Sequence, residues 1–146
     1  MYTAINQVNE NFAIDTVITL FNKSPIPKRI LLVEDNLLNQ KIAKIMLESL
    51  GCIVSVAENA ETALANDLLS FDLIFMDIGL PIISGFDITR RIRADNQYQY
   101  IPIIAMTAHA FQSDKEACLE SGMNDVITKP VMQEELAAML KKWIPN

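Results

Sequence analysis

Residues 30–36 read ILLVEDN, and this stretch decides the fold. Its apolar run, residues 30–33, is typical of a strand that is buried on both faces of a parallel sheet. Glu34, Asp35 and Asn36 follow where that strand ends. The sequence therefore predicts a buried strand that carries two carboxylates to its carboxyl end.

Four further apolar runs repeat this pattern along the chain. They predict strands at residues 53–57, 73–76, 101–106 and 126–127. Between them, and after the last, apolar residues recur at the spacing of helices. Because five strands alternate with five helices, we expect an α/β fold with a parallel sheet that is covered on both faces.

Capping residues mark the ends of the expected helices. The first helix carries Leu38, Ile42, Ile45, Met46 and Leu50 and stops at Gly51. Asn59 caps a second helix with Ala60, Leu64 and Leu68 on one face, and Ser84 caps the third. Ser113 and Glu116 form a capping box for the fourth helix, which stops at Gly122.

Polar groups stand at the ends of four of the expected strands. Glu34 and Asp35 follow the first strand, Asp77 the third, Thr107 the fourth, and Lys129 the fifth. Any one of them alone is most simply a turn or capping residue. At one edge of a sheet, however, three carboxylates would repel one another, and a hard divalent cation such as Mg²⁺ relieves that repulsion. Four such groups at strand ends thus predict a magnesium site beside a lysine.

Composition excludes several other classes of protein. The net charge of −6 and the lack of a long basic run argue against direct binding of nucleic acid. No apolar run approaches the roughly 20 residues that cross a bilayer, so we expect no membrane contact. Cys52 and Cys118 match no zinc spacing and are expected to be free thiols in a reducing cytoplasm.

Residues 1–28, which end in Ser24-Pro25-Ile26-Pro27, are expected to be a linker or extension before a domain at 29–146. Within this segment, residues 12–21 fit a helix or a strand equally well.

Four stretches with similar gaps between them carry a family resemblance. They are ILLVEDN, LIFMDIGLP, IIAMTAHA and DVITKP, within residues 28–144. Together they resemble the receiver domains of two-component response regulators, most closely those of hybrid sensor histidine kinases. The resemblance implies a flavodoxin-like doubly wound sheet with strand order 2-1-3-4-5.

The resemblance also implies roles for single residues. Asp77 is expected to be the phosphoacceptor, and Thr107 and Lys129 to contact the phosphoryl oxygens. Glu34, Asp35, Asp77 and the Gly79 main-chain carbonyl are expected to bind Mg²⁺. The expected donor is a phosphohistidine on a histidine kinase or a histidine phosphotransfer domain, which would dock near Leu37, Leu38, Ile42 and Pro130. Whether the parent is an enzyme, as a hybrid kinase would be, stays open.

Two positions depart from the family pattern. Val126 stands where the family usually has Tyr or Phe, three residues before the lysine, so we expect a smaller rearrangement on phosphorylation. Gly79 leaves one side of the site open. It also weakens the alternative of a haloacid dehalogenase-type phosphatase, which needs a second Asp there. A flavin-binding flavodoxin is disfavoured because Glu34 and Asp35 would repel its phosphate; an interaction module that works without phosphorylation stays an alternative.

Overall fold

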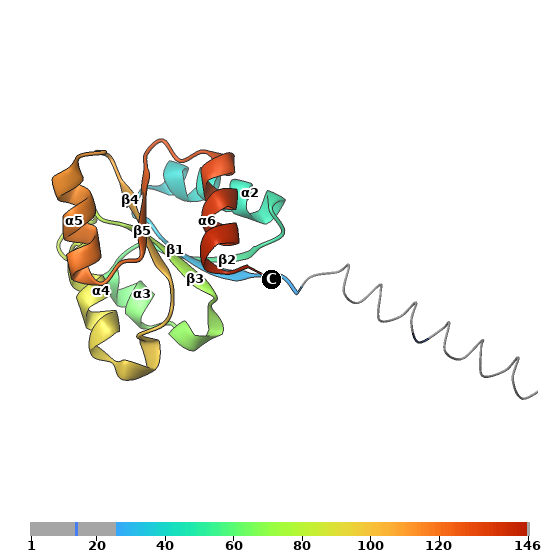
Figure 1. Ribbon diagram of the computed structural model, residues 1–146, viewed down its shortest axis with the longest axis horizontal. Coiled ribbons are helices and arrows are strands. Elements are labelled where there is room, and N and C mark those ends of the chain that lie inside the picture. Colours follow the sequence, from blue (N-terminus) through green and yellow to red (C-terminus); the bar gives the residue numbers. More distant parts are fainter. Residues whose placement is uncertain (1–13, 15–25, 146) are drawn as a thin grey trace, which may run out of the picture.

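The computed structural model describes residue 14 and residues 26–145. In that part of the chain, five parallel strands form one sheet in the order β2-β1-β3-β4-β5 (Figure 1). The strands are β1 (Arg29–Val33), β2 (Ile53–Ala57), β3 (Leu73–Asp77), β4 (Ile103–Thr107) and β5 (Asp125–Thr128). The helices are α2 (Leu37–Ser49), α3 (Ala60–Leu64), α4 (Gly85–Ala94), α5 (Gln112–Ser121) and α6 (Gln133–Trp143). This is the flavodoxin-like doubly wound sheet that the sequence and the resemblance predicted.

Burial of the strands follows their places in the sheet. Every residue of β3 and β4 is buried, as is all of β1 except Arg29. The edge strand β2 is only partly buried, with Ile53 and Val56 exposed. The central strands are buried because helices cover both faces of the sheet, which explains their unbroken apolar runs.

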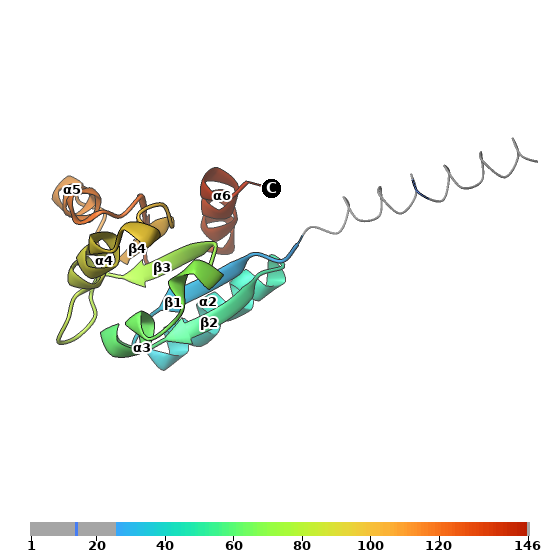
Figure 2. The same ribbon diagram turned by 90° about the horizontal axis from the view of Figure 1, so that it is seen from below.

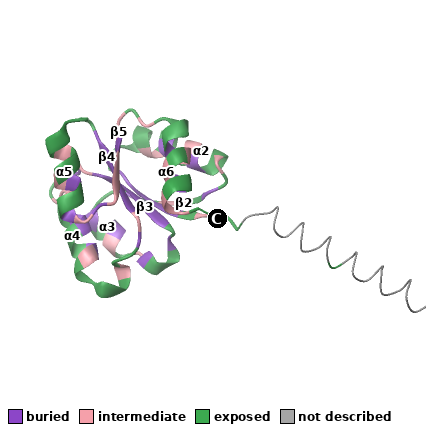
Figure 3. Ribbon diagram, in the orientation of Figure 1, coloured by how far each residue is buried: buried purple, intermediate pink, exposed green. Residues whose placement is uncertain are grey.

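Two hydrophobic cores lie on opposite faces of the sheet. One joins the inward residues of α3, α4 and α5 to the sheet, and it includes Ile88, Ile92 and Cys118. The other joins α2 and α6, and it includes Leu47, Leu136 and Leu140. Figure 1 shows the strands between these two sets of helices, and in Figure 3 the buried residues concentrate along the strands. Cys52 and Cys118 are both buried free thiols, as predicted.

Two of the three predicted helix caps are confirmed. Asn59 and Ser84 each accept a hydrogen bond from a main-chain N–H in the first turn of their helix, and Asn36, which was not predicted as a cap, does the same for α2. The predicted capping box of α5 is wrong: the helix begins at Gln112, so that Ser113 lies inside it, and Phe111 at the N-cap position makes no side-chain cap hydrogen bond. The glycine stops are confirmed, because Gly51 and Gly122 both adopt positive φ.

Two further sequence predictions need correction. Helix α3 ends at Leu64, and Leu68 lies in a separate 3-10 turn, Leu68–Ser70, whose first N–H groups are capped by Asp67. Strand β4 begins at Ile103, after Pro102, because proline cannot donate to a ladder. On α2, the buried residues are Ala43 and Leu47, whereas Leu38, Ile42 and Ile45 are exposed.

The expected division at residue 28 stays a prediction. β1 begins at Arg29, and the segment 12–21 lies almost entirely outside the described residues. None of the helices in the described part of the chain has the length and apolar character needed to cross a membrane.

Candidate functional site

The parallel sheet brings the predicted site residues to one edge. Glu34 and Asp35 follow β1, Asp77 and Thr107 are the last residues of β3 and β4, and Lys129 follows β5. Because β1, β3, β4 and β5 are neighbours in the sheet, their carboxyl ends converge. Ligands bind at this end of the strands in open α/β sheets.

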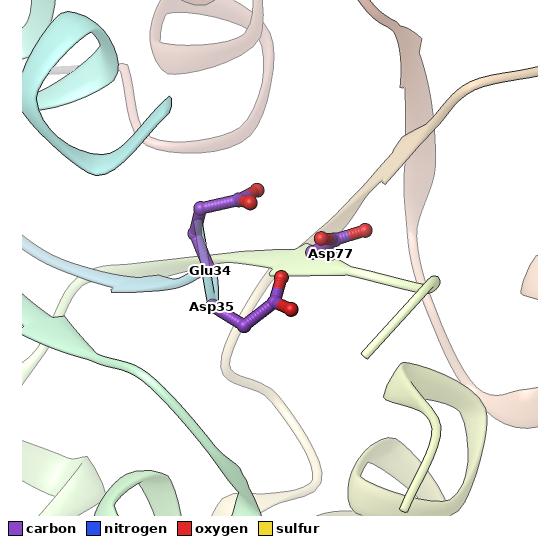
Figure 4. A group of neighbouring side chains, drawn as sticks. All are labelled: Glu34, Asp35 and Asp77. Atoms are coloured by element: carbon purple, nitrogen blue, oxygen red, sulfur yellow. The ribbon is translucent and has the colours of Figure 1, made fainter. Parts of the chain in front are cut away.

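Three carboxylates form a cluster at this edge. Glu34, Asp35 and Asp77 each offer an oxygen atom, and these atoms lie within 4.8 Å of one another (Figure 4). The residues Glu34 and Asp77 are only 2% and 4% exposed, whereas Asp35 is exposed to solvent. Such a set of hard oxygen donors, with one open side, could hold a metal ion.

Lys129 supplies the positive charge beside this cluster. Its Nζ lies 3.1 Å from Asp77 Oδ2 and 3.2 Å from Glu34 Oε2. Burial alone would lower the pKa of Lys129, but its hydrogen bonds and charge interactions with Asp77 and Glu34 raise it above the usual 10.5. Burial, followed by the charge of Asp77, raises the pKa of Glu34 above 4.5 even though Lys129 opposes the shift. Three carboxylates thus face one ammonium at this edge of the sheet.

Residues at the start of α2 hold Glu34 in place. The Gln40 side-chain amide donates to the Glu34 main-chain carbonyl at 2.7 Å. The Asn36 main-chain N–H and the Asn39 side-chain amide donate to Glu34 Oε1 at 3.2 and 3.4 Å. The EDNLLNQ stretch thus fixes the carboxylate that pairs with Lys129. The sequence alone indicated a resemblance at these positions and no such contacts.

Asp77 is held from both its side chain and its main chain. The Gly79 N–H donates to Asp77 Oδ1 at 2.9 Å, which leaves Oδ2 to Lys129. A Cβ atom at Gly85 would lie 2.4 Å from the Asp77 carbonyl oxygen and 2.8 Å from Ile78 Cα, so no other residue fits there without a shift of the backbone. The role of Gly85 was missed in the sequence, and its only signal was its place at the end of the loop that starts at Asp77.

Thr107 and His109 close the other side of the site. Thr107 is 1% exposed, and its Oγ1 accepts a hydrogen bond of 3.1 Å from the His109 main-chain N–H. The exposed His109 ring stacks on Phe111, with 5.6 Å between ring centroids. On β5, Val126 is half-buried against the core beneath α3, α4 and α5.

An open pocket of about 490 Å³ lies above these residues. The residues that line it are Glu34, Asp35, Asn36, Asn39, Asp77, Ile78, Gly79, Thr107, Ala108, His109 and Lys129. All of the predicted side chains therefore face one space, which has the size of a small anion with its hydration. A Cβ at Gly79 would lie 3.5 Å from Asp77 Oδ1, an ordinary contact, so glycine here widens the opening and is not required by packing.

Comparison with known proteins agrees with this geometry. Residues 30–141 match the family model of the response regulator receiver domain. Hybrid signal transduction histidine kinase I of Dictyostelium discoideum is 39% identical over 148 residues, which covers 96% of this chain and 8% of that protein. The chain thus spans a small part of such a kinase.

Two solved structures are similar in both sequence and fold. The receiver domain of the sensor histidine kinase PA1611 from Pseudomonas aeruginosa, which has a magnesium ion coordinated in its active-site cleft, is 41% identical with a TM-score of 0.72. That comparison covers 83% of this chain and all of the other. A chain in the co-crystal structure of the Saccharomyces cerevisiae phosphotransfer protein Ypd1 and the receiver domain of Ssk1 is 32% identical with a TM-score of 0.72, over 82% of this chain and 91% of the other. This chain therefore belongs to the response regulator receiver domains of two-component signalling.

Proposed function

We propose that Asp77 of this receiver domain accepts a phosphoryl group from a phosphohistidine. The observation that carries the proposal is the position of Lys129, whose ammonium contacts Asp77 Oδ2 and Glu34 Oε2 at the floor of an open pocket. A lysine held between two carboxylates at strand ends places a fixed positive charge where phosphoryl oxygens would arrive.

The transfer exchanges one bond to phosphorus for another. A carboxylate oxygen of Asp77 attacks phosphorus, the new P–O bond forms as the P–N bond to the donor imidazole breaks, and the released nitrogen takes up a proton. Such transition states spread negative charge over the equatorial oxygens, so catalysis consists mainly of positioning and charge stabilisation. Lys129 supplies charge, the Thr107 hydroxyl can donate to a phosphoryl oxygen, and the Gly79 N–H orients Asp77.

Mg²⁺ is the cofactor that fits the donor set. Glu34, Asp35 and Asp77 offer carboxylate oxygens within 4.8 Å of one another, and the Gly79 main-chain carbonyl is the further proposed ligand. Mg²⁺ prefers such hard oxygen ligands and keeps several waters, which suits a pocket open to solvent. When bound, it would neutralise charge on the carboxylates and on the phosphoryl group. Burial, and after it the charge of Asp77, raises the pKa of Glu34, and a bound cation would favour the charged carboxylate.

The proposed partners are a histidine kinase and a histidine phosphotransfer domain. The docking surface is expected beside the pocket, on exposed residues of α2 and at Pro130. Leu37 and Leu38 are each 64% exposed and Ile42 is 43% exposed, which is unusual for apolar residues at the start of a helix that packs on a core. The Ypd1 complex of a similar receiver supports this class of partner. We further propose that the parent is a hybrid kinase in the cytoplasm, with residues 1–28 as the linker to a domain at 29–146.

Substitution of the phosphoacceptor tests the proposal directly. In Mg²⁺ and acetyl phosphate, the wild-type chain should gain one hydroxylamine-labile phosphate, measured by intact-protein mass spectrometry. Asp77→Asn should keep the fold, because the amide is nearly isosteric, and should gain none. Asp114→Asn, on α5 and outside the pocket lining, is the matched control and should be labelled normally. Normal labelling of Asp77→Asn would show that the phosphoacceptor is another residue.

A further inference from the structure

Ile82 occupies a strained turn beside the pocket. Its φ is +67°, and it is the only non-glycine residue with positive φ among those that the structure describes. The Ile83 N–H donates to the Pro81 carbonyl at 2.7 Å, which closes a γ-turn centred on Ile82. The γ-turn with positive φ is the rarer and more strained form, and a β-branched residue is least suited to it.

The strained turn does not allow the Ile82 side chain to pack within this domain. Ile82 is fully exposed, at 103% of the reference value, whereas its neighbour Leu80 is 7% exposed and Ile83 packs against the core. The two neighbours therefore hold the turn in place and aim Ile82 at solvent. Glycine or asparagine would adopt this backbone at lower cost, so isoleucine must be explained by something outside the free domain.

The loop that carries Ile82 begins at the phosphorylation site, whose lining includes Ile78 and Gly79. It leaves β3 at Asp77 and returns at Gly85, whose N–H donates to the Ile78 carbonyl at 3.4 Å and whose Cα packs on the Asp77 main chain. Both ends of the loop are thus fixed at the phosphoacceptor, and three residues separate Ile82 from Ile78. In Figure 2 this loop, between β3 and α4, extends beyond the carboxyl ends of the strands.

We infer that Ile82 is an apolar anchor that inserts into the protein carrying the phosphohistidine. This inference rests on the proposed function and adds a second contact to it. Helix α2 lies on one side of the carboxylates, and the loop after β3 leaves on the other (Figure 4). A protein that brings a phosphohistidine over Asp77 must cover the rim between them. Burial of Ile82 there recovers apolar area that the free domain leaves in water.

Phosphoryl donors of two sizes distinguish an effect of Ile82 on docking from an effect on the phosphoryl-transfer reaction. Phosphoramidate has the same P–N bond as phosphohistidine and needs only the pocket, whereas phosphorylated Ypd1 also needs the surface. Ile82→Asn should slow transfer from Ypd1 by about tenfold, the size expected for loss of one anchor. Labelling by phosphoramidate should stay within about twofold of the wild type, because the pocket is intact. The strained backbone suits asparagine better, so the midpoint of thermal unfolding should rise by about 3–5 °C.

The controls use matched side chains. Ile26→Asn makes the same change at a residue that is 83% exposed, lacks positive φ and precedes β1, at the opposite end of the sheet. It should change neither rate. Ile82→Leu keeps an apolar side chain and should retain transfer from Ypd1.

The other possible outcomes separate a failure of the Ile82 anchor from a failure of the proposed function. If Ile82→Asn accepts the phosphoryl group from Ypd1 at the wild-type rate, Ile82 is no anchor, while the proposed function stands. Equal slowing with both donors would mean that Ile82 acts on the pocket, which also overturns the inference. If sedimentation shows that the substitution dissociates a dimer while transfer is unchanged, the surface belongs to a second copy. A wild-type chain that phosphoramidate cannot label would refute the proposed function itself.

Discussion

Lys129 faces two carboxylates at once, and a third lies within reach of both. At the residue scale this imbalance of charge is the main property of the site. The carboxylates of Glu34 and Asp77 are nearly inaccessible to water, so solvent screens their repulsion poorly. Asp35 is exposed and adds charge from the open side. The apo site is therefore less stable than its hydrogen bonds alone would make it.

Removal of one charge should consequently stabilise the metal-free domain. Asp35→Asn should raise its free energy of unfolding in EDTA by about 0.5–1 kcal/mol, a modest gain because Asp35 is exposed. The same change should weaken Mg²⁺ binding by at least about tenfold, since even groups behind the ligands have effects of that size. Urea unfolding in EDTA and an NMR-monitored Mg²⁺ titration measure the two quantities. Asp114→Asn serves as control, and unchanged Mg²⁺ affinity in Asp35→Asn would exclude Asp35 as a ligand.

At the scale of elements, one carboxylate fastens the last helix to the last strand. Asp125, the first residue of β5, accepts hydrogen bonds on Oδ2 from Lys142 Nζ at 2.8 Å and from Trp143 Nε1 at 2.9 Å. Its Oδ1 accepts from the Val126 N–H at 2.9 Å. Burial would raise the pKa of Asp125, but the hydrogen bonds from Lys142 and Trp143 outweigh it and lower the pKa below 3.8. The charged form is therefore favoured in the folded state.

The hydrogen bonds from Lys142 and Trp143 to Asp125 predict that the stability of the domain depends on pH. Because the folded pKa is lowered, the stabilisation is present above 3.8 and is lost as the pH falls toward the folded-state value. Asp125→Asn should reduce the free energy of unfolding near neutral pH by about 1 kcal/mol, a value discounted for the exposure of Lys142. The difference from wild type should shrink at about pH 3. Urea unfolding in EDTA at both pH values measures it.

A matched comparison is available on α2. Glu48 pairs with Lys44 at 3.8 Å, and both side chains are about half exposed. Glu48→Gln should change stability by less than about 0.5 kcal/mol at either pH. A constant loss in Asp125→Asn at both pH values would show that the carboxylate's charge is not what matters.

Element boundaries show where sequence reasoning succeeded and where it failed. The strands and the caps at Asn59 and Ser84 were predictable because their signals are local: apolar runs, and a polar side chain before a helix. The start of α5 was not: the helix begins at Gln112, two residues earlier than the Ser113 cap signal indicates. On α2, the exposure of Leu38 and Ile42 was expected, whereas the burial of Ala43 and Leu47 was not. Spacing identifies apolar positions on a helix but cannot say which of them the neighbouring elements cover.

The sequence predicted which residues form the site, but not the contacts that hold those residues in place. Strand ends that converge place Glu34, Asp77, Thr107 and Lys129 together, and parallel topology alone implies this. The Gly85 contact and the Ile82 turn depend on how the loop returns. Arg93 is a further case, because its guanidinium donates to the carbonyls of Gly122 and Tyr98 and to Asn124 Oδ1, across segments far apart in sequence. Such contacts have no local signal.

At the scale of the whole molecule, phosphorylation should cause a confined rearrangement. Thr107 accepts a hydrogen bond from the His109 N–H, so movement of its hydroxyl toward a phosphoryl group should pull residues 108–111 with it. Val126 is small and stiff, and cannot swing to fill the space as a ring would. Amide chemical-shift changes on phosphorylation should therefore concentrate in the β4–α5 loop and fade along β5.

Val126→Phe provides the comparison for this prediction. A ring at this position can change rotamer, so the changes should then extend along β5 and reach α6. Two-dimensional NMR spectra of both proteins, recorded with and without acetyl phosphate, measure the extent. Strong changes in α6 of the phosphorylated wild type would contradict the prediction.

The strand order also has a consequence for the growing chain on a ribosome. β1 pairs with β2 on one side and β3 on the other, after which β4 adds to β3 and β5 adds to β4. Each strand that emerges after β1 thus finds its partner already synthesised, and none must insert between two that are paired. If the strands pair in this order as synthesis proceeds, Glu34 and Asp77 meet before β5 is made, and the repulsion between them then lasts until translation delivers Lys129.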